Sequence, residues 1–168
     1  MSVLTRTLAV VPLTRAAFAP FGDVIEAEAA SDRYPVNDGT AMRYHDLANI
    51  DTARDGGQPV LSIFRAQPRE LPFEVAMLES HPLGSQAFVP LDPAITFLVV
   101  VADDPGSPPR AFRASRGQGV NYHRGTWHHP LITLDRAGDF LVIDRGGEGH
   151  NCDEVALDTI WRIERSRA

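Results

Sequence analysis

The chain has 168 residues, 43% of them hydrophobic, and carries a formal net charge of -6 with a pI near 5.4. This composition is not that of a disordered chain, and the length is too short for two separate domains that each have a hydrophobic core. We therefore expect a single domain over residues 1–168. The acidic balance without an arginine-rich or lysine-rich block argues against nucleic acid as a partner, and the single cysteine, Cys152, offers no disulfide, which makes the cytoplasm the expected compartment.

A strand over residues 4–13 is the first element that the sequence predicts, and the only expected helix follows it. Thr14 can accept a hydrogen bond from the first helical turn, so we expect a short helix over residues 15–22. Phe18 and Phe21 lie three positions apart in this segment and should point toward the core.

The rest of the chain is patterned as short strands separated by turns. Polar stretches at residues 31–39, 51–58 and 103–109 are expected to form surface loops. The apolar run at 94–102 is about half of the roughly 20 residues that a membrane-spanning helix needs, so we expect a buried strand and no membrane partner. The strands expected after the helix cover residues 23–28, 41–47, 59–66, 72–81, 85–91, 94–102, 110–114, 126–134, 139–145 and 155–164. This series predicts an all-β sandwich or barrel.

Strand alternation places two polar side chains of the segment 72–81 on one face. Phe73, Val75 and Met77 begin this face, and Glu79 and His81 end it. If the apolar part is core, then Glu79 and His81 project together into a polar cavity. The alternative is that the strand leaves the sheet here and both side chains meet solvent.

The stretch "GVNYHRGTWHHPL", residues 119–131, contains three of the six histidines. Because successive side chains of a strand point to opposite faces, only one of His128 and His129 can face the interior. Each of the two faces also carries apolar residues, so periodicity alone does not tell which histidine points inward. His123 precedes the expected strand and is predicted to lie in a solvated turn.

Taken together, "ESHPLGSQ" and "GVNYHRGTWHH" resemble the two motifs of the cupin superfamily. The resemblance implies a cupin-like β-barrel or jelly roll that holds a metal or ligand among inward side chains. In the second motif a glycine, here Gly125, stands three positions before the metal-binding histidine, which favours His128 as the inward residue. The first motif normally supplies two histidines and an acid, whereas this chain has Glu79, His81 and Gln86.

The cupin resemblance therefore implies a metal site of Glu79, His81, Gln86 and His128. Two imidazole nitrogens and two side-chain oxygens suit nickel, manganese, iron or zinc without selecting among them. Because Gln86 is neutral, it weakens the attraction for a cation, and the same four groups could instead bind substrate directly. A metal-dependent oxygenase, which requires stronger ligands for a redox iron, is less compatible with Gln86.

Longer segments extend the similarity over nearly the entire chain. "YPVNDGTAMRYHDL", "ESHPLGSQAFVPL", "GVNYHRGTWHHPL" and "FLVIDRGGEGHNCDE" are similar to the signature stretches of bacterial ureidoglycolate lyases. Members of that family split (S)-ureidoglycolate into glyoxylate and urea during allantoin degradation and nitrogen assimilation. The resemblance implies the same carbon–nitrogen lyase activity, a cytoplasmic homodimer and an association with nickel.

Cleavage of this substrate requires a base for the hydroxyl proton and an acid for the departing nitrogen. His128 or Glu79 could transfer protons if no metal occupies the same atom. Arg43 is the expected partner of the substrate carboxylate, because a guanidinium matches it with two parallel hydrogen bonds. The remaining substrate-binding residues that we expect are Asn37, Tyr122 and Gln86. Asp144 alternates with apolar residues and could face the cavity or pair with an arginine.

Two alternatives stay open in the sequence. A ureidoglycolate hydrolase would keep the fold and release ammonia and carbon dioxide instead of urea. A non-catalytic cupin that binds a small carboxylate would show tight affinity without turnover.

Overall fold

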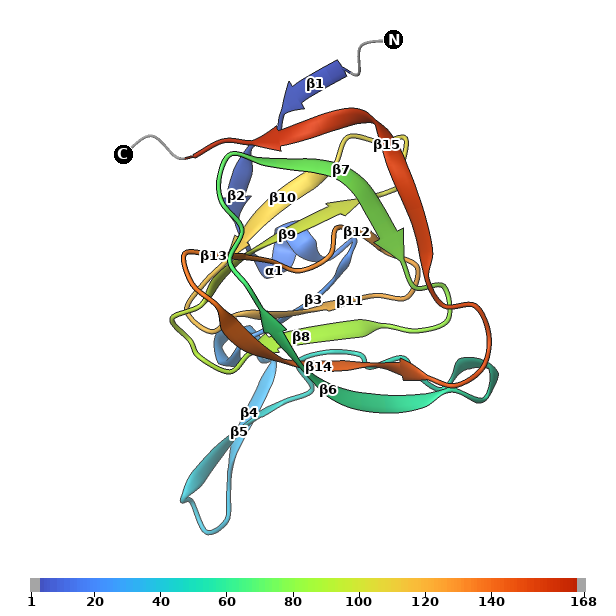
Figure 1. The fold of residues 1–168 in the computed structure, drawn as a ribbon. Helices are drawn as coiled ribbons and strands as arrows, with labels where there is room; N and C mark the ends of the chain where they lie inside the picture. Colours follow the sequence, from blue (N-terminus) through green and yellow to red (C-terminus); the bar gives the residue numbers. More distant parts are fainter. Residues whose placement is uncertain (1–3, 166–168) are drawn as a thin grey trace.

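The computed structural model describes residues 4–165, which form three β-sheets with little helix (Figure 1). The largest sheet has eight strands, with β13 (Ile132–Leu134) paired to β9 beside the main order. In spatial order its other strands are β1 (Leu4–Thr7), β15 (Asp153–Ile163), β7 (Phe73–Ser80), β12 (Trp127–His128), β9 (Thr96–Ala102), β10 (Arg110–Ala114) and β2 (Val10–Pro12).

The second and third sheets have five and two strands. The five-stranded sheet has the order β3 (Gly22–Ile25), β11 (Gly119–Tyr122), β8 (Gln86–Pro90), β14 (Gly138–Gly146) and β6 (Gln58–Ala66). The two-stranded sheet is a hairpin of β4 (Asp32–Val36) and β5 (Ala41–His45). The helical segments are α1 (Arg15–Phe18) and the 3-10 turns η1 (Ala27–Ala29) and η2 (Arg54–Gly56). No helix among residues 4–165 is long and apolar enough to cross a lipid bilayer.

Strand β9 is buried on both faces, which explains the continuous apolar run in its sequence. Its odd-numbered side chains, such as Phe97 and Val99, pack in a core with Phe140 of the five-stranded sheet. Its even-numbered side chains, such as Leu98 and Val100, belong to a second core. The all-β expectation is confirmed, with two cores on opposite sides of one central strand.

The eight-stranded sheet curls because of a break near the N-terminus. Residues 4–13, expected as one strand, form β1 and β2, separated by Leu8 and Ala9. These strands pair with β15 and β10 at opposite ends of the sheet order. A two-residue link can join them only if the two edges approach each other, which gives the sheet its barrel-like curvature.

The predicted helix is present and shorter than expected. The Thr14 hydroxyl accepts a hydrogen bond from the Ala17 amide at 3.3 Å, and α1 ends at Phe18. Pro20 lacks an amide hydrogen and restricts the residue before it, so the helix does not continue to residue 22. Phe18 and Phe21 are buried, as predicted.

Three sequence expectations were wrong in detail. Part of the expected loop 31–39 is strand β4, which reaches β5 through a turn whose Asn37 has φ +54°. Residues 119–122 form β11, a strand that the sequence analysis did not predict. The expected strand 126–134 is divided into β12 and β13, because Pro130 cannot donate to a strand ladder.

Candidate active site

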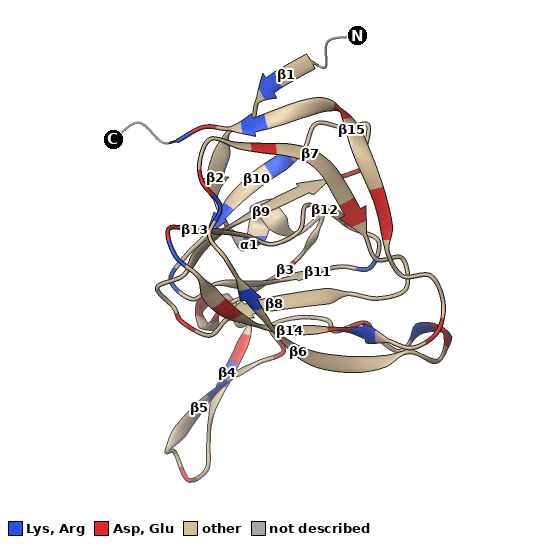
Figure 2. Ribbon diagram, in the orientation of Figure 1, with Lys and Arg blue, Asp and Glu red and all other residues tan. Residues whose placement is uncertain are grey.

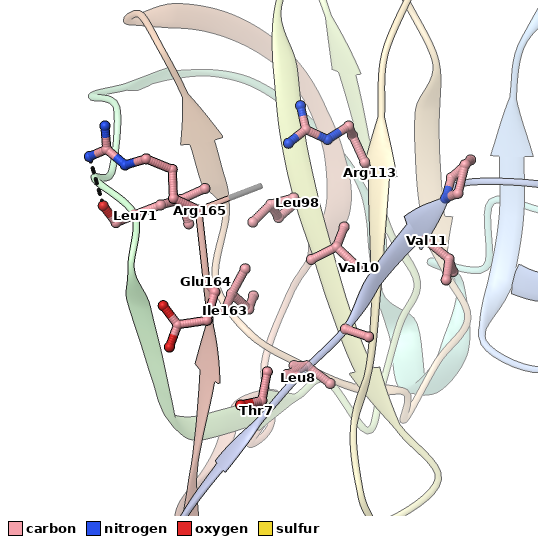
Figure 3. A pocket seen from close by; sticks show the side chains of 12 residues that line it. Thr7, Leu8, Val10, Val11, Leu71, Leu98, Arg113, Ile163, Glu164 and Arg165 are labelled. Carbon is pink, nitrogen blue, oxygen red and sulfur yellow. Dashed lines mark hydrogen bonds between the residues drawn. The ribbon is translucent and has the colours of Figure 1, made fainter. Parts of the chain in front are cut away.

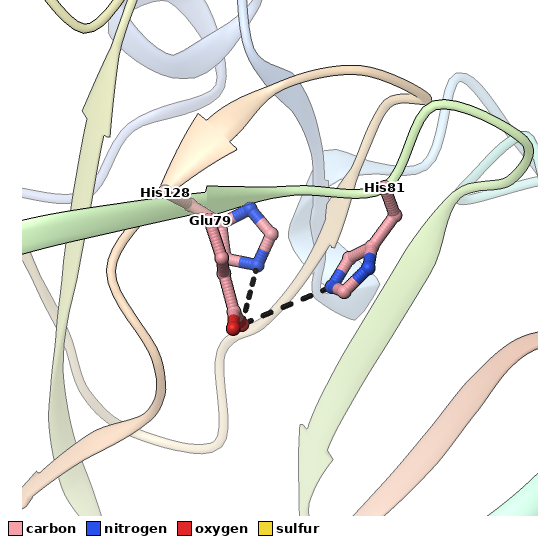
Figure 4. Close-up of side chains that lie close together, drawn as sticks. All are labelled: Glu79, His81 and His128. Atoms are coloured by element: carbon pink, nitrogen blue, oxygen red, sulfur yellow. Dashed lines mark ion pairs between the residues drawn. The ribbon is translucent and has the colours of Figure 1, made fainter. Parts of the chain in front are cut away.

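The strands β7 and β12 bring an acid and a histidine together. Glu79 and His128 are directly opposite each other in the antiparallel pairing, so their side chains share one face. The Glu79 Oε1 atom lies 3.3 Å from His128 Nε2 and 3.8 Å from His81 Nε2 (Figure 4). The Glu79 and His81 side chains are 17% and 16% exposed, so the cavity-facing interpretation is favoured over a fully solvated one.

The alternation predicted along 72–81 does not hold throughout. Val75 and Leu78 pack in the same core, although strict alternation would place them on opposite faces. The partner strand β15 has an irregular register between Ala156 and Trp161, opposite this part of β7. The alternation of buried side chains along β7 changes between Val75 and Leu78, next to this irregularity.

Backbone carbonyls fix the orientation of both histidine rings. The Nδ1 atom of His128 lies 2.9 Å from the Thr126 carbonyl oxygen, and Nδ1 of His81 lies 2.7 Å from the Asn151 carbonyl oxygen. A carbonyl oxygen only accepts, so each Nδ1 carries a hydrogen. In the neutral rings both Nε2 lone pairs are therefore directed toward Glu79. Neither Nε2 atom has a hydrogen-bond partner within the described residues.

This arrangement fits a cation. One ligand atom from each of Glu79, His81 and His128 lies within 4.8 Å of the other two. Two lone pairs and a carboxylate meet there without an intervening hydrogen, so a positive charge would satisfy all three groups. Carbonyl groups that hold the opposite ring nitrogen are the usual outer support of histidine ligands.

The charges around Glu79 favour its ionised form. Burial alone would raise the pKa of this carboxyl, but the adjacent His128 imidazole, which can donate to it when Nε2 is protonated, and the nearby His81 and His129 imidazoles outweigh burial and lower the pKa. Glu79 is therefore an anion at neutral pH.

Gln86 and Tyr122 complete the inner wall of the site. They are opposite each other on β8 and β11, and the Tyr122 ring stacks on His128 with centroids 4.1 Å apart. Burial, followed by the negative charge of Glu79, raises the pKa of Tyr122, so its hydroxyl keeps its proton. The Gln86 amide donates to Asp144 at 3.4 Å, while its Oε1 has no partner among the described residues.

His129 and His123 do not join the cluster. His129 is buried edge-on against Phe73, with ring centroids 5.3 Å apart, and burial lowers its pKa. His129 therefore packs as a structural residue, and it lies on the other side of the strand from His128, as strand alternation predicted. His123 is half-exposed and lies 3.3 Å from Asp23.

The structure does not bring Arg43 or Asn37 to the Glu79 cluster of the same chain. Both lie on the exposed β4–β5 hairpin, which extends away from the two larger sheets in Figure 1. The guanidinium of Arg43 lies 5.9 Å from the centre of the Tyr34 ring. Their predicted role in binding substrate stays a prediction.

Sequence reasoning missed the residues that support the site from outside. Asn151 contributes a carbonyl to His81, and its side-chain oxygen accepts a hydrogen bond from the Leu83 amide at 2.8 Å. The exposed Cys152 and Glu154 also offer ligand-type atoms within 4.8 Å of Glu79. The similar segment 140–154 contains all three residues, and this was the only sequence signal that marked them.

A mainly apolar cavity lies elsewhere in the structure and lacks this chemistry. Its volume is about 360 Å³, and it is bordered by the β1–β2 link and the end of β15 (Figure 3). Aliphatic side chains such as Leu8, Leu98 and Ile163 form much of its wall. It brings together no lone pairs comparable to those at Glu79, so we place the candidate active site at the Glu79 cluster.

A family model described as ureidoglycolate lyase matches residues 5–164. The chain belongs to this family. A ureidoglycolate lyase of Burkholderia mallei (strain NCTC 10229) is 57% identical over 159 residues, covering 93% of each chain. A ureidoglycolate lyase of Pseudomonas entomophila (strain L48) is 54% identical over 152 residues, covering 89% of this chain and 90% of the relative. The ureidoglycolate lyase match therefore includes every residue of the Glu79 cluster.

The chain is also similar in structure to a 3,4-ketoisomerase from Helicobacter canadensis. The TM-score is 0.41 at 13% identity, covering 73% of this chain and 84% of the isomerase. These values are too low to transfer a residue or an activity to this member of the ureidoglycolate lyase family.

Proposed function

We propose that the protein is a ureidoglycolate lyase that eliminates urea from (S)-ureidoglycolate and yields glyoxylate at the Glu79 cluster. Family membership supports the reaction. The observation that carries the location is the convergence of Glu79 with the Nε2 atoms of His81 and His128. Gln86 and Tyr122 border the same space and would contact the substrate.

The elimination moves two protons and breaks one bond. A base removes the hydroxyl proton, the carbon–oxygen bond becomes a double bond, and the carbon–nitrogen bond breaks as the departing nitrogen gains a proton. Glu79, whose lowered pKa keeps it ionised, can accept the hydroxyl proton. The protonated hydroxyl of Tyr122 and the amide of Gln86 can donate hydrogen bonds that orient the substrate.

Glu79, His81 and His128 would also hold a divalent metal, with Gln86 as a fourth oxygen ligand. The metal would polarise the carboxylate and hydroxyl oxygens of the substrate when bound. Nickel is the proposed ion on the basis of family resemblance, since the donor set itself suits several metals. An atom of Glu79 or His128 that binds the metal is not free to transfer a proton at the same time.

The remaining properties that we propose also rest on resemblance. They are a cytoplasmic location, a homodimer, and a role in allantoin degradation and nitrogen assimilation. The hydrolase alternative is not favoured, because the family model and the curated relatives carry the lyase name.

Product analysis tests the proposed reaction. Purified protein of measured metal content is incubated with ureidoglycolate labelled with carbon-13, with and without chelator, and the products are followed by NMR. Equal amounts of glyoxylate and urea are the expected result. Ammonia in place of urea would indicate the hydrolase, and tight binding without turnover would indicate a non-catalytic cupin.

A further inference from the structure

Arg145 is a buried arginine that has no part in the proposed reaction. It is 7% exposed and forms no ion pair among the described residues. Asp144 and Arg145 are consecutive residues near the end of β14, where red and blue adjoin in Figure 2. Side chains of β14 alternate, and Phe140 and Val142 face the core. Asp144 therefore points inward, and Arg145 points to the opposite side of the sheet.

Three backbone carbonyls hold the guanidinium group. The Nε atom of Arg145 donates to the Arg54 carbonyl oxygen at 3.0 Å. Its Nη2 atom donates to the carbonyl oxygens of Asp55 at 3.2 Å and Glu148 at 3.1 Å. A buried charge without a carboxylate partner is costly, and an apolar side chain would fill the same space without that cost. The arginine adds a planar fork that joins two loops, here called the η2 loop (residues 51–57) and the Asn151 loop (residues 147–151).

Two glycines allow the chain to pack closely around this side chain. A Cβ atom at Gly84 would lie 2.6 Å from Cβ of Arg145, and one at Gly57 would overlap the Nε atom. Gly57 belongs to the η2 loop, and Gly84 belongs to the segment that connects β7 to β8, here called the His81 turn (residues 81–85). The η2 loop and the His81 turn therefore both enclose the Arg145 side chain.

The same three segments meet at the support of His81. The η2 loop is tied to the His81 turn, because the Asp51 amide donates to Ser85 Oγ and the Ser85 amide donates to the Asp51 carbonyl oxygen, both at 2.8 Å. The Asn151 loop supplies the carbonyl oxygen that accepts a hydrogen bond from His81 Nδ1 at 2.7 Å. The contacts of Arg145 thus join the segment that carries His81 to the segment that orients its ring.

We propose that Arg145 is a positioning residue, which sets the direction of the His81 Nε2 lone pair by holding the Asn151 loop against the His81 turn. The contacts run from the guanidinium to the Glu148 carbonyl, along the loop to Asn151, and from the Asn151 carbonyl to the His81 ring. The consequence for catalysis rests on the proposed function.

His128 provides an internal comparison, because its ring is oriented by a different carbonyl. Its Nδ1 atom lies 2.9 Å from the Thr126 carbonyl oxygen. The η2 loop reaches this turn through the ion pair of Asp51 with Arg124, which at 3.9 Å is long and partly exposed and so contributes little. Loss of Arg145 should therefore change the His81 ring and leave the His128 ring as it is.

The ring nitrogens test this inference without an assay of activity. Nitrogen-15 chemical shifts of metal-depleted protein, at a pH well above the usual histidine pKa, distinguish a ring with hydrogen on Nδ1 from one with hydrogen on Nε2. In the wild type both His81 and His128 should carry hydrogen on Nδ1. In Arg145→Met the signals of His81 should shift to those of a mixture of the two tautomers, and the signals of His128 should not move.

Ile163→Val is the control for a general loss of stability. Ile163 is buried and lies opposite Phe73, at the far end of the β7–β15 pair from Glu79. Removing one methyl group there leaves a cavity in the core without touching the three segments around Arg145. Both histidine rings should keep their wild-type signals in this variant.

Gly57→Ala is a second variant that keeps the arginine, should Arg145→Met not fold. The added methyl group would displace the guanidinium, so the His81 signals should again shift. Gly56→Ala is its matched control, because a Cβ atom there meets no atom within 4 Å. An unchanged His81 ring in folded Arg145→Met or Gly57→Ala would overturn the proposal. So would equal changes in both rings, or a shift that Ile163→Val or Gly56→Ala reproduces.

Steady-state kinetics separate this inference from the proposed function. If the wild type cleaves ureidoglycolate, Arg145→Met should lower kcat/KM about 10-fold, as expected for the loss of an outer support of a ligand. An inactive wild type would refute the proposed function instead, and the ring signals would still decide the role of Arg145.

Discussion

His81 and His128 owe their orientation to backbone atoms, and Glu79 is the side chain on which both converge. Glu79→Gln keeps the shape of this side chain and removes its charge. We expect kcat/KM for ureidoglycolate to fall roughly 10²- to 10⁴-fold, because the variant loses both a base and an anionic ligand. Steady-state kinetics together with the bound metal per chain measure the two losses, and full activity in the variant would contradict the placement of the site.

Asn151 offers a subtler change at the same site. Its side-chain oxygen accepts a hydrogen bond from the Leu83 amide, and its backbone carbonyl oxygen accepts one from Nδ1 of His81. Asn151→Ala should lower kcat/KM about 10- to 100-fold by loosening the support of a ligand, and should cost about 1 kcal/mol of stability through the lost hydrogen bond.

Asn151→Asp is the matched control, because it retains an acceptor oxygen. It should recover much of the activity and the metal content lost in Asn151→Ala. Equal loss in both variants would indicate that the hydrogen bond to Leu83 does not support the site.

The sequence predicted the side chains of the site better than their supports. Strand alternation placed Glu79 beside His81, and motif spacing selected His128. The contributions of Thr126 and Asn151 to the histidines are backbone carbonyls, which every residue has, so no side-chain pattern distinguishes them.

At the scale of elements, long apolar runs were predicted well and short strands less well. The run at 94–102 contains β9, because burial on both faces leaves a continuous apolar signal. The expected strand 41–47 contains β5, but β4 was missed, because it makes no core contact that would require apolar alternation. The turn "NDG" at 37–39 was the available sign, since these residue types tolerate its positive φ angles.

The side-chain hydrogen bond from Asn121 of β11 to Asp23 of β3 should be sensitive to acid. Burial raises the pKa of Asp23, but hydrogen bonds from Asn121 and the Asn49 amide, with smaller effects from His123, outweigh it and lower the pKa. The unfolded chain therefore binds a proton more readily than the folded chain. The stabilisation is present above the unfolded pKa, near 3.9, and is lost as pH falls through the folded value.

Asp23→Asn measures this effect. The free energy of unfolding should fall by about 1–2 kcal/mol at pH 7, where charged hydrogen bonds are lost. Urea denaturation of both proteins should give a smaller difference near pH 3, and a difference independent of pH would contradict the assignment.

The arrangement of the whole molecule was the least predictable level. Strands β1 and β15 come from opposite ends of the described chain, yet they are paired. Alternation assigns side chains to faces but does not identify the neighbouring strand, because many pairings satisfy the same pattern. The barrel expectation came from the number of short strands and from family resemblance.

Metal binding should stabilise the molecule as a whole. A ligand that binds only the folded chain, at about 100 times its Kd, adds about 2.7 kcal/mol. For a chain of this size we expect nickel to raise Tm by roughly 5–10 °C. Scanning calorimetry of metal-depleted protein with and without nickel measures the shift, and Glu79→Gln should reduce it strongly. An equal shift in the variant would place the metal elsewhere.

The two-sided burial of β9 has a consequence for hydrogen exchange. Its residues Phe97–Val101 lie between two cores and pair with strands on both sides, so no local opening exposes their amides. Exchange there requires global unfolding and reports its free energy directly. A cation bound at Glu79 should therefore slow exchange along a strand that contributes none of its ligands.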